Sequence, residues 1–355
     1  MRLVLFPTYT ETGASSRYRI YQYIPCFKQY NTKVYPFFDE NYIPGQNLKS
    51  IKGILYLFKI YLGRLYRMAC LQKDDVVILQ YEFTKLLPFN TLFFKIFRIK
   101  YIVDFDDAVF HDYDCNKNRI IRTLFKNKIA HVIKHAKIVI TGSPYLTDYA
   151  SRFNPNIIEI PTSIDLKKYK RSLQEKNNDK FVIGWIGSSS TSLHLRLIVD
   201  ALKVLHDENI NFELKLIGYD SKEGINFGTI PLKMVKWEAS TEISELATID
   251  VGIMPLIDFP FARGKCAFKL IQYMAMAKPT ISSSFEANLK VDINKENLFA
   301  DTTENWVNAF KEIIDNRGFY KQIGLRNRKI IENYYCIQSN AEKYVNIIES
   351  VKNVR

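Results

Sequence analysis

Short apolar runs alternate along the chain with longer segments in which apolar residues recur at every third or fourth position. Short continuous runs bounded by turn residues are typical of buried strands, and the longer spacing is typical of helices. A repeated strand–helix succession predicts parallel sheets joined by crossover helices, the α/β class. Because 355 residues exceed one ordinary core, we expect two Rossmann-like, doubly wound domains in tandem.

The predicted strands fall into two series. In the first half of the chain they cover Leu3–Phe6, Lys33–Phe38, Val76–Gln80, Tyr101–Phe105, Ile138–Thr141 and Ile157–Ile160. Helical patterns separate them over residues 15–30, 49–71, 89–98, 118–135 and 144–152. In the second half the strands cover Phe181–Ile186, Glu213–Ile217, Met234–Trp237, Val251–Pro255 and Thr280–Ser283, and the region from Thr303 onward is helical. Two such domains would face a central cleft at the carboxyl ends of their sheets, where open α/β sheets bind ligands.

A polar, highly charged segment separates the two series. Lys170–Lys180 lacks any apolar period and is typical of an exposed interdomain linker. We therefore expect an N-terminal domain over residues 1–170 and a C-terminal domain over 171–335, followed by a last helix over 336–355 that can pack back on the N-terminal domain.

The net charge of +13, from 50 basic and 37 acidic side chains, indicates an acidic partner such as nucleic acid, anionic lipid or a phosphorylated small molecule. No zinc-finger spacing, RNP-like segment or basic-region heptad is present, so charge alone is weak support for nucleic acid. The five scattered cysteines form no C-x-x-C pair, which argues against a disulfide framework or a zinc site and favours a reducing cytoplasm. Without a signal peptide or an apolar run of bilayer length, we expect no membrane-spanning segment.

Two loops at the ends of predicted strands are rich in small residues, namely Pro7–Arg17 and Gly184–Ser192. Small side chains let backbone amides approach an anion, and the helix that follows adds its partial positive charge. Either loop alone is as well explained as a tight turn with Ser15 or Ser192 as a helix cap, but two loops at equivalent positions favour a phosphate ligand. Neither loop matches G-x-G-x-x-G or G-x-x-x-x-G-K-[ST], which disfavours a dinucleotide oxidoreductase or a P-loop enzyme.

The segment Phe261–Pro279 follows a predicted strand and predicts a helix that opens near Gly264. Along such a helix Lys265, Lys269, Gln272 and Met276 would share one face. Arg263, Gly264 and Lys265 at its start would combine bare amides with two cations, an arrangement suited to a diphosphate. The alternative is that the lysines form an ordinary solvated helix face.

Four segments of the chain resemble retaining glycosyltransferases of family 4, which have the GT-B fold, and in particular the bacterial branch that builds surface polysaccharides. They are Gly13–Pro25, Tyr101–Phe110, Ile160–Asp165 and, most specifically, Arg263–Pro279. The resemblance implies transfer of a sugar, with retention, from a nucleotide-diphosphate sugar to a glycan or lipid-linked acceptor. It places the enzyme in the cytoplasm, at the inner face of the cell membrane, without a metal or other cofactor.

The resemblance also implies site residues. For catalysis these are Arg263, Lys265, Asp106 and Asp107; for the donor Gly187, Ser188, Ser189, Thr191, Trp237, Gly264, Cys266, Ala267, Lys269 and Gln272; for an acceptor or phosphate Gly13, Ala14, Ser15 and Arg17. The chain departs from the family at several positions. Gly264 and Gln272 stand where the family has a Glu-x7-Glu pair, Ser188 and His194 fall near its usual Arg and Lys, and Thr162 replaces an asparagine. Positive charge for the leaving diphosphate would then come from Arg263, Lys265 and Lys269.

The run Asp104-Phe-Asp106-Asp107 contains a D-x-D pattern, which in another glycosyltransferase fold holds a divalent metal. Strand alternation would point Asp104 and Asp106 the same way, with Asp106 and Asp107 at the carboxyl end of the strand. The cationic segment already offers positive charge, so we expect no metal. A catalytic carboxylate and one that merely caps the next turn both remain open.

The segment Lys49–Lys73 has six basic residues, and no acidic residue occurs from Asn41 to Lys73. It predicts either an amphipathic helix on an anionic membrane or an ordinary domain helix with lysines at its rim. Two other functions also remain open for the whole chain, another sugar-nucleotide enzyme such as an epimerase and a basic nucleic-acid-binding protein.

Overall fold

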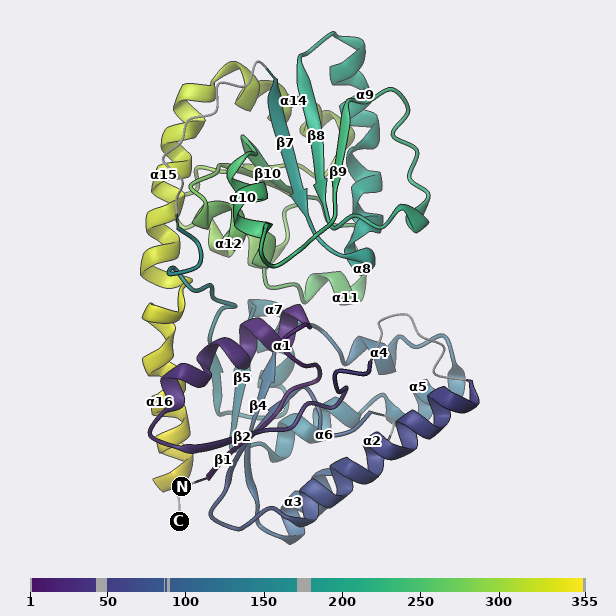
Figure 1. Cartoon of the computed structure of the whole chain (residues 1–355), viewed down its shortest axis with the longest axis vertical. Helices are drawn as coiled ribbons and strands as arrows, with labels where there is room; N and C mark the ends of the chain where they lie inside the picture. The colour runs from purple at the N-terminus through teal and green to yellow at the C-terminus, as the bar shows by residue number, and fades with distance from the viewer. Residues whose placement is uncertain (1, 43–49, 86, 88–89, 171–179, 354–355) are drawn as a thin grey trace. The chain divides into compact units, whose positions relative to one another are not determined.

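A computed structural model describes residues 2–42, 50–85, 87, 90–170 and 180–353. The chain divides into two compact units (Figure 1). Unit 1 comprises Met1–Thr162, Gly264–Cys266 and Asn340–Arg355, and unit 2 comprises Ser163–Arg263 and Ala267–Ser339. The predicted linker Lys170–Lys180 lies almost wholly outside the described residues. Within the described ranges, no helix is both long and apolar enough to cross a membrane.

Unit 1 contains a six-stranded parallel sheet in the order β2-β1-β3-β4-β5-β6. Its strands are β1 (Arg2–Phe6), β2 (Asn31–Val34), β3 (Val76–Gln80), β4 (Lys100–Phe105), β5 (Ile138–Thr141) and β6 (Ile157–Glu159). Strands β3 and β4 are buried almost throughout, as expected for parallel strands covered on both faces. Strand β2 ends before the predicted Phe38, although the backbone amides of Phe37 and Phe38 still donate to the carbonyls of Pro7 and Thr8. The side chains of Phe37 and Phe38 pack into an aromatic cluster with Ile60.

The helices of unit 1 connect these strands. They are α1 (Ala14–Arg19), the 3-10 helix η1 (Tyr21–Phe27), α2 (Ile51–Ala69), α3 (Asn90–Ile96), α4 (His111–Asp114), α5 (Arg119–Phe125), α6 (Lys128–His135) and α7 (Pro144–Ser151). The final helix α16 (Ile337–Asn353) adds most of its length to this unit. The chain order of the strands reverses between β1 and β3, so the carboxyl ends of these two strands form a topological switch point.

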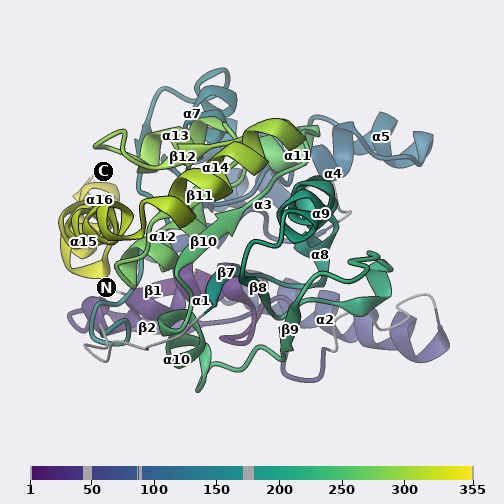
Figure 2. The same cartoon turned by 90° about the horizontal axis from the view of Figure 1, so that it is seen from above.

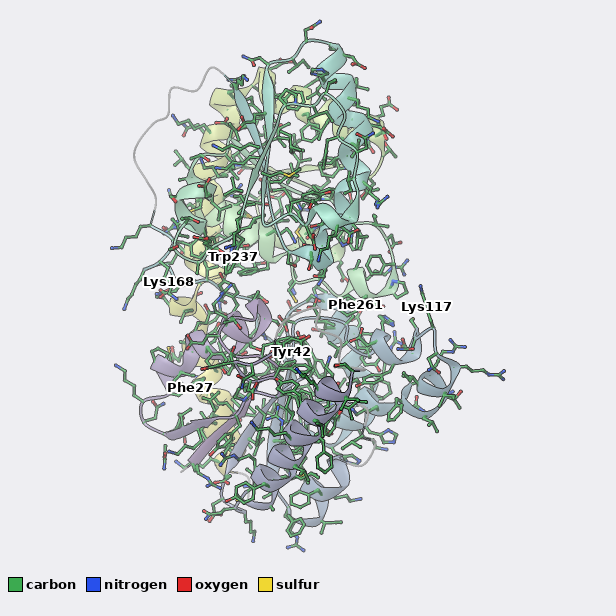
Figure 3. All side chains as sticks on the ribbon, turned by 45° about the vertical axis from the view of Figure 1, so that its right-hand side comes forward. Phe27, Tyr42, Lys117, Lys168, Trp237 and Phe261 are labelled. Atoms are coloured by element: carbon green, nitrogen blue, oxygen red, sulfur yellow. The ribbon has the colours of Figure 1, made fainter. Side chains whose placement is uncertain are left out.

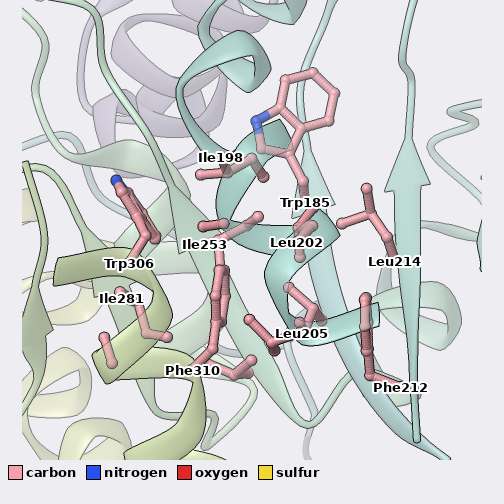
Figure 4. Packing of buried hydrophobic residues seen from close by; sticks show 14 of the residues in the cluster. Trp185, Ile198, Leu202, Leu205, Phe212, Leu214, Ile253, Ile281, Trp306 and Phe310 are labelled. Atoms are coloured by element: carbon pink, nitrogen blue, oxygen red, sulfur yellow. The ribbon is translucent and has the colours of Figure 1, made fainter. Parts of the chain in front are cut away.

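Unit 2 contains a second six-stranded parallel sheet in the order β12-β11-β10-β7-β8-β9, the strand order of the Rossmann fold. Its strands are β7 (Phe181–Ile186), β8 (Phe212–Ile217), β9 (Leu232–Val235), β10 (Val251–Met254), β11 (Thr280–Ser282) and β12 (Leu298–Phe299). A core of aromatic and branched side chains, including Trp185, Phe212, Trp306 and Phe310, covers one face of this sheet (Figure 4). The two-residue strand β12 was not predicted, because it is too short to show a period.

The helices of unit 2 are α8 (Ser189–Ser192), η2 (Leu193–Ile198), α9 (Val199–Asp207), η3 (Ser221–Glu223), α10 (Glu242–Ala247), α11 (Pro260–Arg263), α12 (Phe268–Ala275), α13 (Glu286–Val291), α14 (Thr303–Asp315) and α15 (Arg317–Tyr334) (Figures 1 and 2). The prediction of a helix that opens near Gly264 is wrong. One short helix ends at Arg263 and another begins at Phe268, so Lys265 does not share a helix face with Lys269 and Gln272. The break follows from Ala267, whose backbone is left-handed with a φ of 53°.

Candidate functional site

In unit 1, helix α1 and strand β4 hold two carboxylates in matched register. On α1, Ser15 contacts Asp106 and Arg19, four residues later, contacts Asp104. The two carboxylates are two residues apart, with Asp104 in β4 and Asp106 just after its end. Four residues rise about 6 Å along a helix, and two residues rise about 6.6 Å along a strand. The predicted common orientation of Asp104 and Asp106 is therefore confirmed.

Asp104 is fully buried and has a structural role. Its oxygens lie 2.8 Å and 2.9 Å from Nε and a terminal nitrogen of Arg19, and the hydroxyl of Tyr344 on α16 also donates to it. Burial opposes the charge on Arg19, but Asp104 outweighs it and raises the pKa of the guanidinium. Both oxygens of Asp104 are thus engaged by donors from Arg19 and Tyr344.

Asp106 directly follows β4 and accepts hydrogen bonds from the hydroxyls of Ser15 and Tyr81, which lie in the segments after the switch-point strands β1 and β3. Gln80 at the end of β3 supports this arrangement, because its amide nitrogen donates to Ser15 Oγ over 2.8 Å and its amide oxygen accepts from Ser16 Oγ over 2.6 Å. Tyr81 has a φ of 62° although it is not glycine. Backbone strain of this kind often occurs where a structure fixes a functional group.

Asp107 pairs with Lys265, a residue distant in sequence. Lys265 Nζ lies 2.8 Å from an oxygen of Asp107. Burial alone would lower the pKa of Lys265, but Asp107 and Asp106 raise it, so the ammonium stays charged. The approach depends on Gly264, because a Cβ at this position would lie 2.5 Å from the Cβ of Ala108. The adjacent Cys266 donates its thiol to the Asp106 carbonyl over 3.0 Å and is buried.

The remaining predicted residues of unit 1 lie on or directly before helix α1. Gly13 is the N-cap residue of α1 and Ala14 is exposed at its start. Arg17 stacks on the ring of Tyr18. Ser15 lies inside α1 and bonds to side chains, so its interpretation as a helix cap is wrong.

In unit 2, the loop after β7 is bonded mainly to itself. Ser188 is the N-cap residue of α8 and forms a capping box with Thr191, whose Oγ1 accepts from the Ser188 amide over 3.1 Å. Ser189 is exposed, and Ser192 bonds back to the Ser188 carbonyl, so Ser188 and not Ser192 caps the helix. Gly187 allows this tight turn, since a Cβ there would lie 2.3 Å from the ring of Trp185.

A second network in unit 2 joins two predicted donor residues through an unpredicted one, Glu242. This buried carboxylate accepts from Trp237 Nε1 over 2.7 Å, from Gln272 Nε2 over 3.2 Å and from the hydroxyl of Tyr169 over 2.5 Å. Gln272 Nε2 also donates to Tyr169 over 2.9 Å. These two contacts engage the amide nitrogen of Gln272 and leave its amide oxygen as the acceptor of the side chain.

The cationic residues predicted for the leaving group are held separately. Arg263 makes a two-pronged, exposed ion pair with Asp258, at 2.7 Å and 2.8 Å. Lys269 lies over the ring of Trp185 at 5.5 Å. His194 is buried and stacks on Phe259, and its Nδ1 accepts from the Ile257 amide over 2.9 Å. This bond places the proton of the neutral ring on Nε2.

Among the described side chains, one group of three could hold a metal, namely His111, Asp114 and Cys115 on and just after α4. His111 Nδ1 lies 2.7 Å from Asp114 and 3.5 Å from Cys115 Sγ. These residues are half-buried or exposed and include none of the predicted site residues.

Sequence reasoning missed Gln80, Tyr81, Tyr169, Glu242 and Tyr344. Gln80 ends a predicted strand and Tyr81 directly follows it, so their position at the switch point was a usable signal. Glu242 and Tyr169 carry no signal in the sequence, because only the fold brings them to Gln272. By contrast, the exposed Lys117 and Lys168 extend away from the ribbon (Figure 3).

Two six-stranded parallel sheets with covering helices, one sheet in each unit, form the GT-B fold. A glycosyltransferase from Rickettsia africae ESF-5 superposes with a TM-score of 0.69 and 13% identity over 100% of this chain and 99% of that chain. HepE from Anabaena, solved with UDP-glucose, superposes with a TM-score of 0.72 and 13% identity over 99% of this chain and 100% of that chain. Sucrose-phosphate synthase from Thermosynechococcus elongatus superposes with a TM-score of 0.68 and 12% identity over 99% of both chains. No protein-family model and no curated protein sequence matches the chain.

Proposed function

We propose that the protein is a retaining glycosyltransferase that moves a sugar from a nucleotide-diphosphate sugar to a glycan or lipid-linked acceptor in the synthesis of a bacterial surface polysaccharide. The anomeric carbon exchanges its bond to the diphosphate oxygen for a bond to the acceptor oxygen, and the acceptor hydroxyl loses its proton. A GT-B fold over the full length of structures such as the HepE complex with UDP-glucose supports the donor class. A fold alone hosts many functions, so the argument rests on the sites.

The observation that carries the proposal is the convergence of Asp106, Asp107 and Lys265 beside the switch point of unit 1, to which Asp106 is joined through Tyr81. Open α/β sheets bind ligands at such points. A fixed ammonium stabilises charge that develops on a departing diphosphate, and fixed carboxylates orient an acceptor hydroxyl. In unit 2, Gln272 with Glu242 offers an acceptor to a ribose hydroxyl, and Lys269 adds a cation.

Binding of nucleotides tests the proposal first. We expect uridine or guanosine diphosphate, or their sugars, to raise the melting temperature, since a ligand at about 100 times its Kd adds about 2.7 kcal/mol. Gln272→Ala should weaken that binding about fivefold, the worth of one hydrogen bond. An exposed lysine variant, Lys321→Gln, is the matched control.

Product analysis separates this function from the two alternatives. A transferase releases nucleoside diphosphate only when an acceptor is present. Interconversion of nucleotide sugars without acceptor would indicate an epimerase. Salt-sensitive binding to arbitrary duplex DNA, without affinity for any nucleotide sugar, would indicate a nucleic-acid-binding protein.

A further inference from the structure

Helix α2 leaves a long apolar stripe exposed on the surface of unit 1. Ile51, Leu55, Phe58 and Leu62 are 80%, 63%, 62% and 50% exposed. Ile54, Leu65 and Tyr66 are exposed as well. At 100° per residue these seven side chains span about 120° of the helix surface. Isolated exposed apolar residues are common, but a contiguous stripe of this size marks an interaction surface.

The opposite face of α2 is already anchored in the unit. Gly53, Ile60, Arg64 and Met68 are buried. Arg64 points inward, where its guanidinium donates to the carbonyls of Tyr35 and Pro7 and lies over the rings of Phe6, Phe37 and Phe83. Burial lowers the pKa of Arg64 to about 9. Arg64 is therefore part of the core. The helix packs on unit 1 through this other face, so the exposed stripe is not the face that the unit itself buries.

The charges beside the stripe decide what covers it. Lys52 and Lys59 border one side, Arg67 lies further round the helix and all three are exposed. The described part of the segment from Asn41 to Lys73 contains no acidic residue, and Lys49 lies outside the described residues. An apolar stripe edged by lysines fits a surface that is apolar inside and anionic at its rim, which is the composition of an anionic bilayer interface.

A second copy of the chain is the competing occupant. Positions 51, 55, 58, 62, 65 and 69 follow the alternating four-and-three spacing of a coiled coil. In an antiparallel pair Lys52 and Lys59 would face their own counterparts, and in a parallel pair they would face apolar residues without an acidic partner. Both arrangements leave the lysine charges unmatched, so charge favours the membrane.

We propose that the exposed face of α2 docks the protein on an anionic membrane, with the apolar stripe inserted at the interface and Lys52 and Lys59 against lipid phosphates. This inference concerns where the protein binds and stands apart from the proposed sugar transfer. Vesicle binding is measured without nucleotide sugar, so a failure here leaves the transferase proposal intact.

The experiment is sedimentation of the full chain with vesicles of equimolar phosphatidylglycerol and phosphatidylcholine, against vesicles of phosphatidylcholine alone. The stripe variant carries Leu55→Ser, Phe58→Ser and Leu62→Ser, and the charge variant carries Lys52→Gln and Lys59→Gln. The matched control carries Ile120→Ser, Leu124→Ser and Phe319→Ser, which remove three equally exposed apolar side chains elsewhere. Melting curves show that each variant is folded.

We expect wild type and control to bind anionic vesicles at low salt and the stripe variant to lose at least about tenfold in partitioning. Each lysine contributes about fivefold near an anionic surface, so the charge variant should lose about 25-fold, and less at high salt. Failure of wild type to bind anionic vesicles overturns the proposal, as does an equal loss in the control. A wild-type dimer that the stripe variant dissolves would assign the face to a second copy.

Discussion

The two small-residue loops occupy the same place in the two units, directly after the first strand of each sheet, yet they are bonded in different ways. In unit 1 the hydroxyls of Ser15 and Ser16 reach across the sheet to Asp106 and Gln80. In unit 2 the hydroxyls of Ser188 and Thr191 close on their own turn as a capping box. Similar compositions thus give one loop that joins three strands and one loop that stabilises itself.

Small residues therefore permit close approach but do not select the ligand. The charge of the groups that face the loop makes that choice. The first loop already donates to a carboxylate, so a hydroxyl-bearing ligand suits it better than an anion. In the described contacts of the second loop, no serine hydroxyl donates to a carboxylate, so this loop is compatible with a phosphate. We therefore expect acceptor chemistry in unit 1 and nucleotide binding in unit 2.

The largest expected effect separates the two carboxylates that α1 holds. Asp104→Asn should lower the free energy of unfolding by about 3–5 kcal/mol, because it leaves the buried charge of Arg19 unpaired. Asp106→Asn should cost only about 1 kcal/mol, because hydroxyl donors can still bond to an amide oxygen. Urea unfolding followed by circular dichroism measures both. Equal losses would contradict the division into a structural and a functional carboxylate.

The next largest effect is expected on turnover, when the two cations that flank Gly264 are replaced one at a time. Lys265→Met should lower turnover by roughly ten- to a hundredfold, the worth of a charge-assisted hydrogen bond, and leave the fold intact. Arg263→Met should lower it less, since this side chain is exposed and paired with Asp258. Steady-state rates with Lys321→Met as control measure the difference. A near-wild-type rate for Lys265→Met would remove this residue from the mechanism.

A smaller effect tests the loops themselves. Ser188→Ala should lower the free energy of unfolding by about 1 kcal/mol through loss of the cap, without a change in kcat. Ser15→Ala should lower kcat about fivefold, because one donor to Asp106 is lost, with little change in the KM for the nucleotide sugar. Thermal melts and steady-state kinetics on both variants give the comparison. The reverse pattern would exchange the roles that we assign to the two loops.

The smallest effect is expected from metal removal. Asp104 is bound by Arg19 and Tyr344, and Lys265 already supplies a positive charge beside Asp107. Activity should therefore be unchanged by a strong chelator. The assay compares chelated enzyme with enzyme to which magnesium or manganese has been returned. Loss of activity that either ion restores would establish a metal-dependent step.

Most strands of the two sheets could be predicted from the pattern of apolar residues. Strands β3, β5 and β7 match their predicted bounds, because a continuous apolar run between turn residues has few ways to be buried other than as a parallel strand. The sequence also placed Asp106 and Asp107 directly after β4. These features are local, since each depends on a few consecutive residues.

Which polar groups meet depends on the fold and could not be predicted from sequence spacing. Lys265 and Asp107 are separated by 158 positions in sequence, and Gln272 and Glu242 by 30, so no spacing rule connects them. The left-handed Ala267 directly precedes α12 and separates two short helices that periodicity alone would join. Arg64 turned inward from a segment whose basic residues all looked alike in the sequence. Apolar periodicity determines which elements form, whereas contacts between distant residues determine which polar groups are buried, paired or left to face a ligand.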